Sequence, residues 1–238
     1  MKRLSFLLAL FGCLLFSTCL FAQEDLRYFN TDELPDIIKC LPAPPDSLSQ
    51  AFSYDVLRYM WGKTQRQNPD RVAQVKRDAV WTYDALIDEF DNIFGLELSK
   101  KTTPEIWKLL ESSLQTVDQM RVAPKAYYRR VRPFEYFGEN TLTGEDDILR
   151  GEGSYPSGHT IRSWLVATLL SEINPLAANE LYARAWRYGE NRVIAGAHWQ
   201  SDVDVSRLVA AIGYGRLQTS VGFRMQMARA QNEFRRLY

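Results

Sequence analysis

Apolar residues recur at the spacing of an α-helix along most of this chain. A helix is predicted to begin at Thr103-Pro104-Glu105, where proline takes a first-turn position that needs no N–H donor. The apolar stripes comprise Phe52, Val56, Tyr59 and Met60; Val80, Tyr83, Leu86, Ile87, Phe90 and Phe94; and Ile106, Leu109, Leu110, Leu114, Val117 and Met120. Four more helices are predicted at about 157–173, 175–188, 201–219 and 220–237.

Two segments lack this periodicity. Residues 23–48 contain Pro35, Pro42, Pro44 and Pro45 and are predicted to form an extended, looped start to the domain. Residues 134–154 are rich in glycine and are predicted to be a long loop, which in a compact domain is often functional. No alternating run is long enough to predict a strand, so the pattern predicts an all-α, single-domain helical bundle over residues 23–238.

The first 22 residues have the pattern of a secretory signal peptide. Lys2 and Arg3 precede a nearly unbroken apolar run, and small and apolar residues follow to Ala22. The run is short for a membrane span, and no later segment is long enough and free of charge. We therefore expect cleavage near Ala22 and a soluble periplasmic or secreted protein, with an uncleaved anchor as the alternative.

The charge balance excludes some partners. The whole chain has 29 basic and 29 acidic residues; without Lys2 and Arg3 the balance is 29 − 2 = 27 against 29, a net charge of −2. This gives no electrostatic reason to expect nucleic acid or an anionic membrane as a partner. Only Cys40 remains after cleavage, so the mature chain has no intramolecular disulfide.

The tetrapeptide Pro156-Ser157-Gly158-His159 stands before the predicted helix at 157–173. Ser157 is a good N-cap, and Gly158 lets the backbone approach a ligand closely. The first N–H groups of a helix have no partner within it and attract an anion. His159 beside such an anion can donate a proton to a leaving oxygen. The alternative is an ordinary helix start with an exposed histidine.

The second histidine, His198, lies six residues after Arg192 and four before Asp202. If this segment is helical, the carboxylate is one turn away and can orient the imidazole as a nucleophile or base. Arg192 offers a planar fork for phosphate oxygens. Alternatively, Asp202 caps the following helix and Arg192 makes a surface ion pair.

Lys125 and Arg132 add two cations upstream, and on a helix they would share one face. Arg129 and Arg130 stand between them, and basic clusters are usually solvated. Metal binding is disfavoured because the two histidines and one well-spaced carboxylate offer too few ligands. We therefore expect no metal and no cofactor.

Taken together, Lys-x6-Arg-Pro, Pro-Ser-Gly-His and Arg-x5-His-x3-Asp resemble the signature of the type 2 phosphatidic acid phosphatase superfamily. The resemblance is closest to the bacterial class A nonspecific acid phosphatases and covers roughly residues 36–215. The chain departs from the pattern at Asn191, where the family often has serine.

This resemblance implies a role for each residue. His198 would attack phosphorus and form a phosphohistidine, with Asp202 orienting it. His159 would protonate the leaving alkoxide and then activate water. Lys125, Arg132 and Arg192 would neutralise the phosphoryl oxygens. Ser157 and the N–H groups of Gly158 and His159 would complete the cradle, with no metal and no cofactor. The family also implies a homo-oligomer, and the covalent intermediate is compatible with phosphotransfer to other acceptors.

The expected activity is hydrolysis of a broad range of phosphate monoesters, with a bell-shaped pH profile and an acidic optimum because one imidazole must be neutral and the other protonated. Tyr155, Phe134 and Tyr136 are candidate pocket-wall residues. Three alternatives remain: a vanadium-dependent haloperoxidase with the same site, a lipid phosphatase, and a non-catalytic periplasmic phosphate-binding protein.

Overall fold

The computed structural model describes residues 26–238, and within that range the chain is all-α with no strand. The predicted signal peptide lies outside the described residues. The long helices are α2 (Gln50–Gln65), α6 (Pro104–Val117), α10 (Gly158–Ile173), α11 (Ala178–Ala195), α12 (Gln200–Leu217) and α13 (Val221–Leu237). The predicted all-α, single-domain architecture is confirmed.

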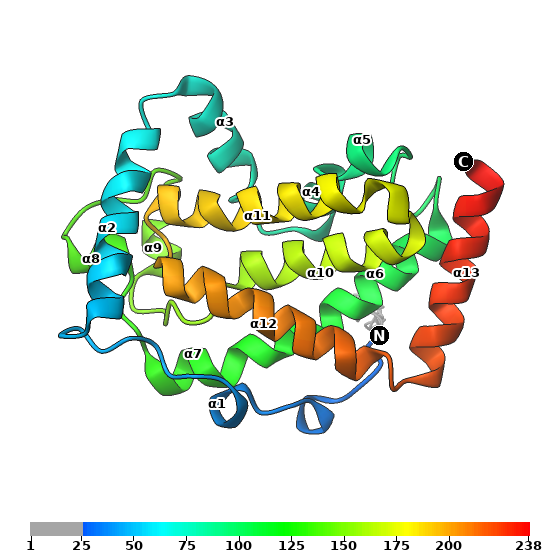
Figure 1. Ribbon diagram of the computed structural model, residues 1–238, viewed down its shortest axis with the longest axis horizontal. Coiled ribbons are helices and arrows are strands. Elements are labelled where there is room, and N and C mark those ends of the chain that lie inside the picture. Colours follow the sequence, from blue (N-terminus) through cyan, green and yellow to red (C-terminus); the bar gives the residue numbers. More distant parts are fainter. Residues whose placement is uncertain (1–25) are drawn as a thin grey trace, which may run out of the picture.

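Helix α10 is the centre of the bundle. It lies between α11 and α12, with α6 behind it and α13 crossing one end (Figure 1). Twelve of its 16 residues are buried, so this helix has no polar face to offer to water. The core around it contains Leu165, Leu169 and Leu170 of α10, packed with apolar residues of α6, α11 and α13. Burial on nearly all sides explains why α10 is not amphipathic; its polar residues Arg162 and Ser163 are buried too and have hydrogen-bond partners within the protein.

Shorter helices complete the chain. They are η1 (Thr31–Glu33), α1 (Ile37–Cys40), α3 (Pro69–Arg77), α4 (Tyr83–Asp88), α5 (Asp91–Phe94), η2 (Asp118–Arg121), α7 (Val122–Tyr128), α8 (Pro133–Tyr136), α9 (Asp146–Leu149) and η3 (Pro175–Ala177). Two expectations need correction here. The segment 134–154, expected to be a loop, contains α9 and most of α8. The helix expected to end near Tyr188 continues to Ala195, because its last turns are buried against α2 and α3.

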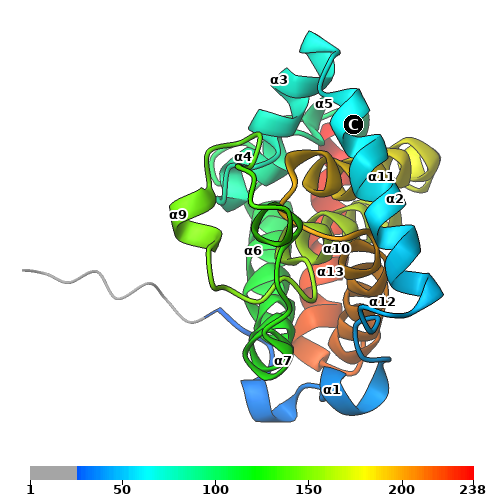
Figure 2. The same ribbon diagram turned by 90° about the vertical axis from the view of Figure 1, so that its left-hand side faces the viewer.

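Three helix ends lie together at one end of the bundle. The N-termini of α10 and α12 and the C-terminus of α11 lie together at the left of Figure 1, where α2 crosses them. Figure 2 views this end directly, with α2 on one side and α9 on the other. Loops that converge on rigid helix ends hold their side chains in fixed positions, which is suited to a binding site.

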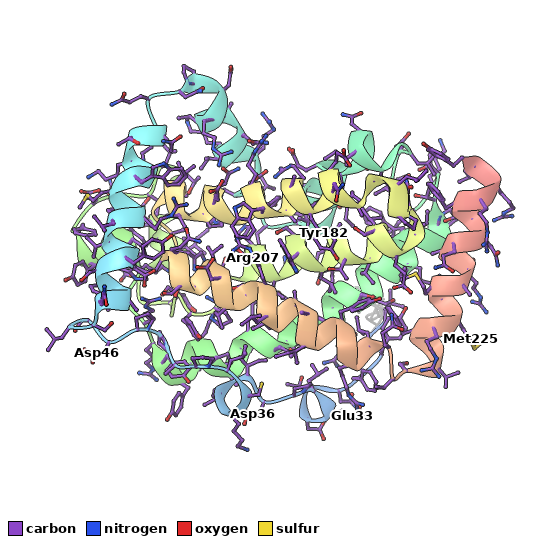
Figure 3. All side chains as sticks on the ribbon, viewed as in Figure 1. Glu33, Asp36, Asp46, Tyr182, Arg207 and Met225 are labelled. Atoms are coloured by element: carbon purple, nitrogen blue, oxygen red, sulfur yellow. The ribbon has the colours of Figure 1, made fainter. Side chains whose placement is uncertain are left out.

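On the outer face of the bundle, side chains also connect segments that are distant in the sequence. The N-terminal segment carries Glu33, Asp36 and Asp46 along the edge of the bundle before α2 begins (Figure 3). On the face shown there, the guanidinium of Arg207 on α12 lies 3.5 Å from the ring centroid of Trp186 on α11, so it ties these two helices together. Within residues 26–238, none of the helices combines the length and apolar character needed to cross a bilayer.

Candidate active site

A pocket of about 470 Å³ opens at the end of the bundle where the three helix termini meet. Its lining includes both histidines and three cationic side chains: His159, His198, Lys125, Arg132 and Arg192. Gly158 also lines it, whereas Ser157 and Asp202 lie behind the wall. The structure thus brings together six of the eight residues singled out from the sequence and places the other two in contact with them.

His198 lies in the turn between α11 and α12, not on a helix. Helix α11 ends at Ala195, and the next residue, Gly196, adopts a left-handed conformation with φ of 83°. The backbone N–H groups of Ala197 and His198 then both donate to the carbonyl of Arg192. The condition that His198 and Asp202 share a helix is therefore not met, because α12 begins only at Gln200. The same turn instead fixes His198 beside Arg192.

The two nitrogens of His198 have different surroundings. Nδ1 lies 3.5 Å from Asp202 Oδ2, an ion-pair distance longer than a normal hydrogen bond. Nε2 lies 3.3 Å from Arg132 Nη1, which can only donate. This arrangement favours the tautomer with a proton on Nδ1 and a lone pair on Nε2. Burial, followed by the charges of Arg132 and Lys125, lowers the pKa of His198 well below its usual value, so its ring is neutral.

Asp202 is a capping residue and a charge partner at once. Its Oδ2 accepts from the backbone N–H of Trp199, the N-cap residue of α12, at 2.9 Å. Its Oδ1 accepts from Arg130 Nη1 at 2.5 Å. Both interpretations of Asp202 from the sequence therefore describe the same side chain, which caps α12 and lies behind His198.

Arg130 is a residue that the sequence analysis missed. It pairs with Asp202 and also, through Nη2, with Asp55 at 2.7 Å, and both carboxylates are fully buried. Asp55 accepts in turn from the backbone and hydroxyl of Ser201. A position next to exposed Arg129 gave no sign of burial, and Asp55 is distant in the chain. Only the packing of α2 against α12 brings these charges together.

His159 is buried rather than exposed, with 8 % of its surface accessible. Its Nε2 lies 3.2 Å from the carbonyl of Ala79, so Nε2 carries a proton and donates. Trp81 packs against its ring at 4.5 Å between centroids. Burial, then the charges of Arg192 and His198, lower the pKa of His159 well below its usual value. An anion in the pocket would counter these cationic charges and raise that pKa.

The start of α10 explains its glycine. A Cβ at Gly158 would come within 2.9 Å of Trp81 Cη2 and 3.0 Å of Arg121 Cδ, so a side chain there would displace both. Ser157 is the N-cap and accepts from the N–H and the hydroxyl of Thr160. Ser157 thus supports the first turn, while Gly158 and His159 present backbone N–H groups at a positive helix end.

Lys125 and Arg132 reach the pocket from different segments. Helix α7 ends at Tyr128, and Arg129 adopts a left-handed φ of 43°, so the expected single helical face does not form. The backbone carbonyl of Gly153 accepts from both cations, at 2.6 Å from Lys125 and 3.3 Å from Arg132. Burial lowers the pKa of Lys125 well below its usual value and that of Arg132 to about 10. Neutral carbonyls hold these cations in place without cancelling their charge.

Arg192 is fully buried, which excludes the surface ion pair considered from the sequence. Its Nη2 donates to both carboxylate oxygens of Glu145, at 3.0 and 2.9 Å. Its Nε and Nη1 have no hydrogen-bond partner among the described residues. Buried guanidinium donors are costly to leave unpaired, so this side chain is equipped to bind further acceptor oxygens.

Asn191 bonds away from the pocket. Its Nδ2 donates to Asp78 at 2.7 Å, and Asp78 is also held by Arg184. Asp78 directly precedes Ala79, whose carbonyl accepts from His159. The residue that departs from the family pattern therefore supports the segment that orients His159.

The pocket wall differs from the expected one. Phe134 and Tyr155 are buried in the core, and the Tyr155 hydroxyl donates to the carbonyl of Pro42. Tyr136 packs against Trp199 instead. The apolar lining comes from Ala79, Trp81, Ile148 and Leu149. These residues follow α3 or belong to α9, segments whose spacing in the sequence gives no indication that they approach the motifs. Among the described residues, no group of three or more His, Cys, Asp or Glu side chains is placed to hold a metal ion.

Comparison with known proteins identifies the family of this chain. The family model of the PAP2 superfamily matches residues 106–222. The non-specific acid phosphatase of Salmonella typhi is 41 % identical over 195 residues, which cover 81 % of this chain and 78 % of that protein. The non-specific acid phosphatase of Providencia stuartii is 36 % identical over 217 residues, covering 90 % and 87 %.

Among solved structures, the chain is similar to a transmembrane PAP2 type phosphatidylglycerolphosphate phosphatase from Bacillus subtilis, at 20 % identity and a TM-score of 0.35, over 69 % of this chain and 92 % of that one. The assignment therefore rests on the sequence relatives. The chain belongs to the PAP2 superfamily, and within it to the class A nonspecific acid phosphatases.

Proposed function

We propose that this protein is a secreted, metal-independent acid phosphatase that hydrolyses a broad range of phosphate monoesters through a phosphohistidine on His198. The family supports the activity class. The observation that carries the mechanism is one pocket with two buried imidazoles, three cations and unpaired donors on Arg192. Such a site binds a phosphoryl group and also supplies a nucleophile.

In the first step, Nε2 of His198 attacks phosphorus and the bond between phosphorus and the ester oxygen breaks. His159, as imidazolium, gives a proton to the departing alkoxide. In the second step, His159 takes a proton from water, the water oxygen attacks phosphorus, and the bond from phosphorus to His198 breaks. Inorganic phosphate leaves and the free imidazole returns. An alcohol in place of water would give phosphotransfer.

Stabilisation of the negative charge on the phosphoryl group in the transition state provides most of the rate enhancement. Lys125, Arg132 and Arg192 line the pocket together with the first residues of α10, so they would neutralise the phosphoryl oxygens there. The depressed pKa of His198 keeps the nucleophile neutral in mildly acidic solution. The pKa of His159 is also depressed in the empty pocket, so the bound phosphoryl dianion itself creates the general acid by favouring the imidazolium.

The test is hydrolysis of p-nitrophenyl phosphate from about pH 4 to 8 by the purified mature protein in EDTA, with His198→Ala alongside. Turnover that disappears in the variant, together with an acid-labile phosphoenzyme on the wild type, supports the proposal. Near wild-type turnover by His198→Ala, or a phosphoenzyme on another residue, contradicts it. Loss of activity in EDTA with recovery on adding a divalent ion would contradict the metal-free mechanism.

A further inference from the structure

The anion pocket already contains an acidic side chain from the chain itself. Both carboxylate oxygens of Glu145 accept from Nη2 of Arg192. Arg192 is completely buried, and the Glu145 side chain is only 18 % exposed. Glu145 also lines the same pocket as His159 and His198. A carboxylate therefore already binds one nitrogen of the guanidinium that the proposed mechanism assigns to the phosphoryl group.

The segment around Glu145 is fastened on both sides. The backbone N–H of Leu142 donates to the carbonyl of Ala195, one turn from Arg192. Thr141 donates through its N–H and its hydroxyl to Asp146, at 2.8 and 3.0 Å. The hydroxyl of Thr143 donates to Glu145 itself at 2.5 Å. These contacts hold the segment before α9, whose position is seen in Figure 2, and Glu145 lines the pocket.

The backbone of Arg192 is held by contacts other than the one with Glu145, and its side chain is enclosed by the surrounding packing. Its side chain is buried, and its carbonyl accepts the N–H groups of Ala197 and His198. Removing Glu145 would leave the backbone contacts in place and free Nη2, the third nitrogen of the guanidinium beside Nε and Nη1. Competition between the carboxylate and an incoming anion is therefore the main consequence of the contact, since both are negatively charged and bind to one buried guanidinium: Glu145 through Nη2, and the incoming anion through the unpaired Nε and Nη1.

We propose that Glu145 is an internal competitor that sets the affinity and selectivity of the pocket for anions. The inference rests on the proposed phosphatase function and deepens it. A phosphoryl group can bond at once to Arg192, Arg132, Lys125 and the N-terminus of α10, so it displaces Glu145 by rotation of that side chain. A small carboxylate has two oxygens and cannot make all of these bonds, so Glu145 excludes it.

The experiment compares Glu145→Gln and Glu145→Ala with Asp147→Asn, a control that removes the same charge from a nearby exposed position in α9. Dissociation constants for inorganic phosphate are measured by calorimetry, and inhibition by phosphate and by acetate is measured with p-nitrophenyl phosphate in a buffer free of carboxylates. Both Glu145 variants are expected to bind phosphate roughly tenfold more tightly, which corresponds to about 1.4 kcal/mol. The control is expected to match the wild type.

Acetate provides a second, independent readout. We expect acetate to inhibit Glu145→Ala competitively, because it can take the position of the missing carboxylate, and to leave the wild type unaffected. Weaker phosphate binding in Glu145→Gln would overturn the proposal and make Glu145 a positioning residue for Arg192. Unchanged phosphate binding with no acetate inhibition would also overturn it.

Calorimetry separates failure of this inference from failure of the proposed function. If the wild type binds phosphate but does not turn over substrate, the enzymatic proposal fails while the competition is still decided by the variants. If neither the wild type nor the variants bind phosphate, the pocket is not a phosphoryl site and both proposals fall.

Discussion

Replacing Arg130 with methionine should destabilise this protein strongly, although Arg130 does not touch the pocket. Its guanidinium neutralises two carboxylates, Asp55 and Asp202, which are both fully inaccessible to solvent. Asp55 would keep its bonds from Ser201, and Asp202 its bond from Trp199, but neither would keep a cationic partner. Removing one partner of a buried ion pair typically costs about 3–5 kcal/mol, so we expect a loss in that range.

Urea unfolding followed by circular dichroism measures this loss. With a slope of about 2 kcal/mol per molar urea, the midpoint should fall by roughly 2 M. The matched control is Arg129→Met, which removes the adjacent but exposed charge and should change stability by less than about 0.5 kcal/mol. The double variant Arg130→Gln with Asp55→Asn should recover part of the loss, because one of the stranded charges is gone. Equal midpoints for Arg130→Met and Arg129→Met would refute the reasoning.

Three further predictions concern the histidines and their supports. The acid limb of kcat/KM should lie well below pH 6.5, because the depressed pKa keeps His198 neutral until then; a limb near 6.5 in a pH–rate series would contradict this. The free energy of unfolding should fall as pH drops below 6.5, by about 1.4 kcal/mol per pH unit for each of His159 and His198, because the imidazoles bind protons more readily in the unfolded chain than in the folded one. Urea midpoints measured across this pH range test the prediction, and a midpoint that does not change with pH would contradict it. Asn191→Ala should lower the free energy of unfolding by about 1–3 kcal/mol and lower kcat more than it raises KM, because it loosens the segment that holds His159. Unfolding curves and steady-state kinetics test this, and an unchanged kcat would contradict it.

Much of the fold could be predicted because helix periodicity is a local property. The helix predicted at 157–173 is observed at Gly158–Ile173, and that predicted at 220–237 at Val221–Leu237. Prediction was poorest where a boundary depends on distant contacts. The C-terminal half of α11 is helical because it is buried. Helix α9 is a single turn, and the glycine-rich sequence around it does not predict a helix.

The sequence by itself determined the chemical inventory: two histidines, the cations Lys125, Arg132 and Arg192, and a helix that begins at an anion-binding tetrapeptide. Those features depend on residue type and on spacing within short segments, so they can be predicted without knowledge of the fold. Tertiary structure alone decided which groups face one another. The bond from Arg130 to Asp202, the carboxylate of Glu145 on Arg192 and the Ala79 carbonyl on His159 each join segments tens of residues apart. Burial also decided the charge states, because the cost of charging a side chain depends on the solvent that packing excludes.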